Sequence, residues 1–118
     1  PILVPQCGVE AEVAFVFRQA YPPRATPYTR DEVAAGMDAC AAIEIVSGRF
    51  AMDAKVSNLE KLADSIINAG LVHDVPRKDW QGLDLGRIKV TVTVNGQTIA
   101  EQEGGHATGD PLGWRPRW

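Results

Sequence analysis

The sequence has 118 residues, a length that suits one domain, and its 45% hydrophobic and 23% charged residues are typical of a globular protein. A net charge of −3 without a basic cluster argues against nucleic acid as a partner, and no apolar stretch is long enough to span a membrane. Cys7 and Cys40 lack partners at metal-binding spacing, so we expect two reduced thiols in a cytoplasmic protein.

The first half of the chain predicts two strands and a helix between them. Strict alternation of side-chain character over residues 9–17 predicts a strand. Thr29 followed by Glu32 forms a capping box, and apolar residues at helical spacing up to Cys40 predict a helix of about three turns. A short run rich in β-branched residues predicts a second strand over residues 42–47.

A second capping box, Ser57 with Glu60, opens another predicted helix. Its apolar spacing continues through Ile67, and Gly70 is expected to end it as a C-cap. Residues 71–75 then predict a strand.

The last predicted elements form a β-hairpin. Branched apolar and polar residues alternate over residues 88–94, and Asn95-Gly96 is the strongest short hairpin signal. Residues 97–103 are the expected partner strand. The predicted fold is therefore a β-rich α+β unit with two short helices.

Three glutamates are candidate ligands of one metal ion. Glu10 and Glu12 are two residues apart on a predicted strand, so their side chains leave the same face with Cα atoms about 6.5 to 7 Å apart. Glu44 lies between two isoleucines in a predicted strand, where a charged side chain is costly to bury unless it is paired or binds an ion. A hard dication such as Mg²⁺, Mn²⁺ or Ca²⁺ would relieve the repulsion among the three. The alternative is a solvated strand face carrying Glu10 and Glu12, with Glu44 paired to Arg49.

These residues also carry a family resemblance. Gly8-Val-Glu-Ala-Glu-Val-Ala-Phe15 resembles the E-x-E strand of the fumarylacetoacetate hydrolase superfamily, in its 2-keto-4-pentenoate hydratase and oxalocrotonate decarboxylase branch. Ala42-Ile-Glu-Ile-Val46, with Arg49-Phe50, resembles the segment that carries the third acidic ligand there. Other segments follow in matching order up to residue 112: Thr29-Arg-Asp-Glu-Val33, Ala63-Asp64, Asn68-Ala-Gly-Leu71, Asn95-Gly96 and Gly104-Gly-His-Ala-Thr-Gly-Asp-Pro-Leu112.

The resemblance implies part of a mixed β-roll and a lyase that holds Mg²⁺ or Mn²⁺ on Glu10, Glu12 and Glu44. The implied reaction is hydration of a 2-hydroxydienoate or 2-keto-enoic acid to a 4-hydroxy-2-keto acid in the catabolism of aromatic compounds. A cytoplasmic homo-oligomer, able to associate with a pathway enzyme, is the implied assembly. Family members extend further in both directions, so residues 1–118 are expected to form a single, partial domain. A decarboxylase, a C–C hydrolase, or a non-catalytic subunit that acts as an assembly partner are the alternatives.

Arg49 and Asp64 are candidate substrate-binding residues. Arg49 could bind a substrate carboxylate through two hydrogen bonds, or pair with an acid of the protein. For Asp64, one turn from a predicted helix end, a structural role is the favoured alternative. Ser65 and Ile67 differ from the residues that the resembling family has at these positions, which bears on the expected substrate contacts more than on the metal site.

Candidates for proton transfer are few. Lys55 falls near a family lysine, and His106 lies in a glycine-rich loop, where a surface histidine without a catalytic role is the alternative. His73, within an apolar strand, is expected to be a packed core residue. A tautomerase that uses Pro1 as its base is a rival with little support beyond that residue.

Overall fold

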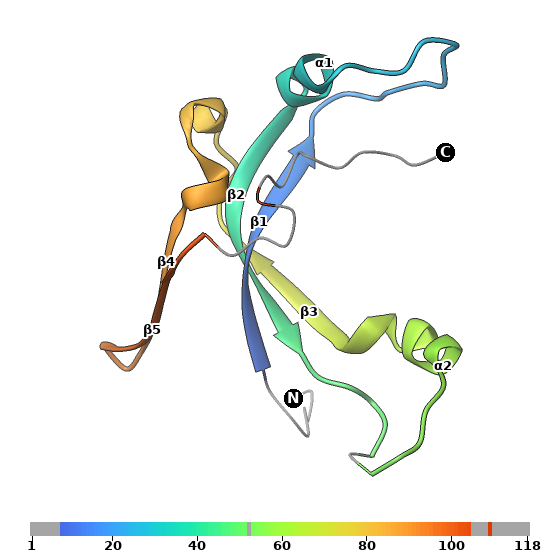
Figure 1. The fold of residues 1–118 in the computed structure, drawn as a ribbon, viewed down its shortest axis with the longest axis vertical. Coiled ribbons are helices and arrows are strands. Elements are labelled where there is room, and N and C mark those ends of the chain that lie inside the picture. The colour runs from blue at the N-terminus through green and yellow to red at the C-terminus, as the bar shows by residue number, and fades with distance from the viewer. Residues whose placement is uncertain (1–7, 52, 105–108, 110–118) are drawn as a thin grey trace. The chain divides into compact units, whose positions relative to one another are not determined.

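The computed structural model describes residues 8–51, 53–104 and 109 of the chain. In these residues, five strands and two short α-helices alternate with 3-10 turns (Figure 1). The strands form a three-stranded sheet of order β1-β2-β3 and a hairpin of β4 and β5. The predicted strand-rich α+β class with two short helices is therefore confirmed.

The chain divides into two compact units. The first contains Ala39–Arg77 and the described residues before Phe17, and the second contains Phe17–Asp38 and the described residues after Arg77. None of the helices in the described residues has the length and apolar character needed to cross a bilayer.

The three-stranded sheet has β2 (Met37–Val46) at its centre, between β1 (Gly8–Phe17) and β3 (Asn68–His73). The arrowheads of β1 and β2 point in opposite directions in Figure 1. β2 also pairs antiparallel with β3, in a register that sets Glu44 opposite Leu71. The strand predicted from the alternation around the E-x-E motif is thus confirmed.

Helix α1 (Arg30–Ala35) lies in the connection from β1 to β2. Its predicted capping box is present, because Thr29 Oγ1 accepts from the backbone N–H of Glu32 at 3.2 Å and Glu32 Oε2 accepts from the backbone N–H of Thr29 at 2.7 Å. The helix ends at Gly36, whose surroundings leave no room for a Cβ because the Tyr21 hydroxyl lies against it.

The prediction that this helix continues to Cys40 is wrong, because β2 already begins at Met37. Ala39 exchanges two backbone hydrogen bonds with Arg77, at 3.1 and 2.8 Å, which only extended backbone can make. Met37 is buried at 2% exposure. Tertiary pairing and burial therefore override the helical spacing of the apolar residues.

Helix α2 (Asn58–Ala63) begins at the predicted Ser57–Glu60 capping box but is shorter than expected. Residues beyond it form a turn, and Gly70 lies inside β3 instead of capping a helix. His73 is exposed, with Nδ1 at 2.9 Å from the carbonyl oxygen of Asp74, so the prediction of a core histidine is wrong.

In the second unit, β4 (Lys89–Val94) and β5 (Gln97–Glu103) form the predicted hairpin. Asn95 and Gly96 have φ angles of 51° and 78°, as a type I′ turn requires.

The core of the second unit includes Trp80, Leu85 and Met37. The indole Nε1–H of Trp80 donates to the carbonyl oxygen of Met37 at 3.0 Å, which satisfies the polar atom of a residue only 4% exposed. Trp80 is therefore a packing residue, as its type predicts.

Candidate metal centre

Neighbouring strands of the first unit bring the three glutamates together. A Cβ added to Gly8 on β1 would lie 3.4 Å from the Cβ of Val46 on β2, so these residues face each other. Two steps along the antiparallel strands set Glu10 opposite Glu44 and leave Glu12 diagonal to it. Both spacings are within the reach of glutamate side chains.

One carboxylate oxygen from each of Glu10, Glu12 and Glu44 lies within 4.8 Å of the others. Glu44 is half-buried, and the two glutamates of β1 are exposed. Within the described part of the chain, none of the ion pairs or hydrogen bonds involves these three side chains. The predicted convergence is therefore present, with no arginine or lysine of the described residues balancing its charge.

The donor set suits a hard cation. All three donors are carboxylate oxygens, which Mg²⁺ and Mn²⁺ prefer over softer ligands. Neighbouring ligands of an octahedral ion with bonds of about 2.1 Å are separated by about 3 Å, so the side chains must close by small torsional changes. Exposed carboxylates also gather at protein surfaces without an ion. The geometry thus permits a metal site without requiring one.

A hollow of about 500 Å³ adjoins the cluster. It is lined by Glu10 and Glu44, by Val46, by the turn Ser65–Ile67 and by Asn68, the first residue of β3. Its volume lies within the range of about 300 to 1,000 Å³ found for small-molecule sites. Carboxylates and branched apolar side chains therefore share one concave surface.

Arg49 and Asp64 bind each other. Arg49 Nη1 lies 2.7 Å from Asp64 Oδ1, and the backbone N–H of Arg49 donates to Oδ2 at 3.0 Å. The Asp64 side chain is 3% exposed. These hydrogen bonds, from the guanidinium first and the backbone second, hold the pKa of Asp64 below its usual value. The acid that pairs with Arg49 is thus Asp64 and not Glu44, and substrate binding by either residue stays a prediction.

Three consecutive non-glycine residues in the turn Ser65–Ile67 have left-handed backbone. Their φ angles are 55°, 52° and 64°. This region is unusual for a β-branched residue, and such conformations cost on the order of 1 to 3 kcal/mol each and concentrate at functional sites. The helical spacing gave no sign of it. In the sequence, the two positions that differ from the resembling family, Ser65 and Ile67, both lie in this turn, and they were the only feature that set it apart.

Of the predicted proton-transfer residues, the structure describes only Lys55. Lys55 is exposed in the segment before α2 and is absent from the described lining of the hollow. His106 and Pro1 lie outside the described residues. The carboxylates are thus the part of the predicted site that the structure assembles.

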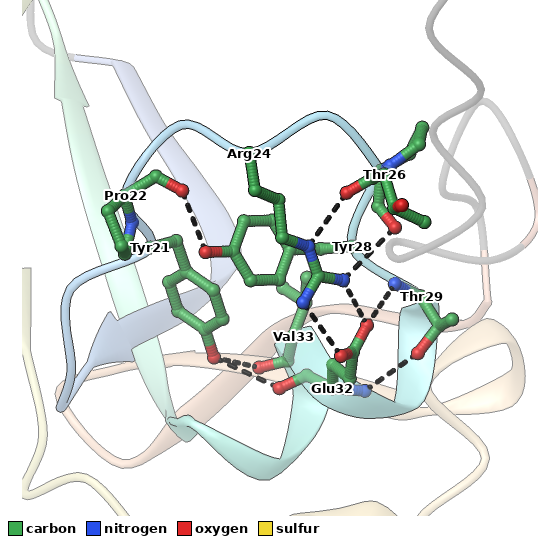
Figure 2. A network of polar contacts seen from close by, with 9 residues as sticks. Tyr21, Pro22, Arg24, Thr26, Tyr28, Thr29, Glu32 and Val33 are labelled. Atoms are coloured by element: carbon green, nitrogen blue, oxygen red, sulfur yellow. Dashed lines mark hydrogen bonds and ion pairs between the residues drawn. The ribbon is translucent and has the colours of Figure 1, made fainter.

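A second hollow, of about 430 Å³, lies in the second unit beside Arg24 and Glu32. Figure 2 shows the Arg24 guanidinium between the Glu32 carboxylate and the carbonyl oxygen of Thr26. Nη1 and Nη2 of Arg24 donate to Oε1 and Oε2 of Glu32 at 3.0 and 2.6 Å, and the guanidinium carbon lies 3.7 Å from the centre of the Tyr28 ring. The charged groups here bind one another, which makes this hollow the poorer candidate.

No protein-family model and no solved structure matches the chain. The family resemblance therefore rests on the ordered motifs of the sequence alone.

Proposed function

We propose that this chain forms the metal-binding core of a lyase that hydrates a 2-hydroxydienoate or 2-keto-enoic acid to a 4-hydroxy-2-keto acid in the catabolism of aromatic compounds. Glu10, Glu12 and Glu44 would hold Mg²⁺ or Mn²⁺. The observation that carries the proposal is the approach of their three carboxylate oxygens to within 4.8 Å of one another. The order of the family-like motifs supports the choice of reaction.

The residues of the proposed site have different roles in this reaction. A dication held by the three glutamates would supply Lewis-acid chemistry for the 2-oxo group of the substrate. Glu44, half-buried in the central strand, and Glu10 opposite it present carboxylates to the hollow. Val46 adds a branched apolar side chain to the same lining. Lys55 and His106 stay candidate proton-transfer groups, although Lys55 does not line the described hollow and His106 lies outside the described residues.

We place the protein in the cytoplasm as a homo-oligomer that can associate with a pathway enzyme. Exposed large apolar residues support an assembly, since Leu71 and Val72 on β3 are 53% and 58% exposed and Leu59 on α2 is 78% exposed. The same exposed residues favour a second candidate function, that of an assembly partner without turnover.

Calorimetric titration with Mn²⁺ tests the proposed site. The wild type should bind, and Glu10→Gln, Glu12→Gln and Glu44→Gln should each weaken binding by about tenfold or more, because each removes a charged ligand. Glu32→Gln is the matched control, an exposed glutamate outside the cluster, and should bind as the wild type does. No binding by the wild type, or equal binding by the three variants, would refute the site.

Product analysis then separates the reactions. A 2-hydroxydienoate incubated with the Mn²⁺-loaded chain should yield a 4-hydroxy-2-keto acid. Release of carbon dioxide would instead indicate a decarboxylase, and a cleaved carbon–carbon bond a hydrolase. Mn²⁺ binding without any turnover would favour the assembly partner.

A further inference from the structure

The left-handed turn Ser65–Ile67 is held from both ends by one side chain. Arg49 Nη1 donates to the carbonyl oxygen of Asp64 at 3.0 Å, and Nη2 donates to that of Asn68 at 3.1 Å. The backbone N–H of Ser47 donates to the carbonyl oxygen of Ile67 at 2.7 Å. A strained backbone persists only where its surroundings determine it in this way.

The residues placed by this turn do not suit an ordinary surface. Ile66 and Ile67 are 65% and 43% exposed, although isoleucine favours burial. Both are β-branched at positive φ, where glycine or asparagine would relieve the strain. Neither solvation nor local backbone preference accounts for two isoleucines here.

Both isoleucines line the hollow beside the glutamates. With Val46 they provide branched apolar side chains, whereas Glu10 and Glu44 provide carboxylates in the same hollow. A ligand with a metal-chelating polar end and a short hydrocarbon tail matches a hollow whose lining combines carboxylates with branched apolar side chains.

We infer that the turn Ser65–Ile67 determines substrate specificity, with Ile66 and Ile67 forming an apolar wall for the tail of a 2-oxo acid whose polar end reaches the glutamates. This inference rests on the proposed function, because the polar end is recognised through the metal. Arg49 and Asp64 act as positioning residues for the wall.

The test measures binding of 2-oxo acids of increasing chain length. Pyruvate, 2-oxobutanoate, 2-oxopentanoate and 2-oxohexanoate are titrated into the full chain in saturating Mn²⁺. Affinity for the wild type should rise by about threefold to fourfold per added methylene, as expected for burial of apolar surface. Ile66→Ser and Ile67→Ser should flatten this rise and leave Mn²⁺ binding unchanged.

Ile99→Ser is the matched control, because Ile99 is an exposed isoleucine that does not line the described hollow. It should keep the wild-type dependence on chain length. The inference is overturned if affinity still rises with chain length in both isoleucine variants. It is also overturned if affinity does not rise with chain length in the wild type while Mn²⁺ still binds; in either case the metal site stands. Failure of the wild type to bind Mn²⁺ overturns the proposed function, and the inference with it.

Discussion

Two groups of carboxylates in this molecule differ in how their charge is balanced. Glu32, in the second unit, binds Arg24 with both oxygens and also accepts from the backbone N–H of Thr29 (Figure 2). These hydrogen bonds, from Arg24 first and Thr29 second, lower the pKa of Glu32 to about 2. The cluster of Glu10, Glu12 and Glu44, in the first unit, has no such partner among the described residues.

Exposure does not explain this difference, since Glu32 and the two glutamates of β1 are all exposed. The difference lies in the neighbours. An acid already paired with an arginine stabilises the fold locally, whereas like charges gathered without a cation leave a place for one from solution. Charge balance therefore distinguishes a structural acid from a candidate ligand better than burial does.

The largest effect expected from this comparison is stabilisation by metal. Mn²⁺ at about 100 times its dissociation constant should raise the free energy of unfolding by about 2.7 kcal/mol. Glu32→Gln should retain this gain, and Glu44→Gln, if it binds about tenfold more weakly, should lose about half of it or more. Urea unfolding with and without Mn²⁺ measures both; an equal gain in the two variants would remove the distinction between the two groups.

A smaller effect is expected at the helix caps. Thr29→Ala removes the acceptor for the backbone N–H of Glu32 and should lower the free energy of unfolding by about 1 kcal/mol. Ser57→Ala removes the equivalent acceptor for Glu60 in the first unit and should cost about the same. Urea unfolding compares them. A much larger loss for Thr29→Ala would show that the cap and the Arg24 pair depend on each other.

Repulsion within the glutamate cluster should have an effect of about the same size as the loss of a helix cap. Two unit charges about 5 Å apart in water repel by less than about 1 kcal/mol. Glu44→Gln removes two such repulsions, with Glu10 and with Glu12, so it should raise the stability of the metal-free chain by less than about 2 kcal/mol. Thermal unfolding at low salt should detect the gain, and 1 M salt should abolish it by screening. A loss of stability at low salt would show that Glu44 has a favourable partner.

The smallest expected effect is the pH dependence due to Glu32. Its pKa falls from 4.5 to about 2 on folding, so its contribution is present above pH 4.5 and is lost as the pH falls towards 2. The pair is exposed, which keeps this contribution small. Urea unfolding at pH 6 and pH 2.5 should show a stability difference between wild type and Glu32→Gln that shrinks in acid. A difference that grows in acid would contradict the assignment.

Local chemistry accounts for the features that could be predicted from the sequence. The alternation of β1 and the two capping boxes each involve residues within a few positions of one another. Asn95-Gly96 adopts positive φ at both positions, which specifies the hairpin without help from the rest of the fold. The same local rules placed Glu10 and Glu12 on one face of a strand.

Other features depend on contacts between residues distant in sequence. Met37–Cys40 had helical spacing but lies in β2, because Ala39 pairs with Arg77. Glu44 was the acid expected as a possible partner of Arg49, and the structure instead places Asp64, the C-cap of α2, beside it.

The glutamate cluster combines both kinds of information. Sequence by itself determined the residue types, and the period of β1 set Glu10 and Glu12 on one face. Only the tertiary structure brought Glu44 beside them, because strand register is a property of the paired backbone. The left-handed backbone of Ser65–Ile67 likewise depends on tertiary contacts. Hydrogen bonds from Arg49 and Ser47, which no local sequence pattern encodes, hold it in place.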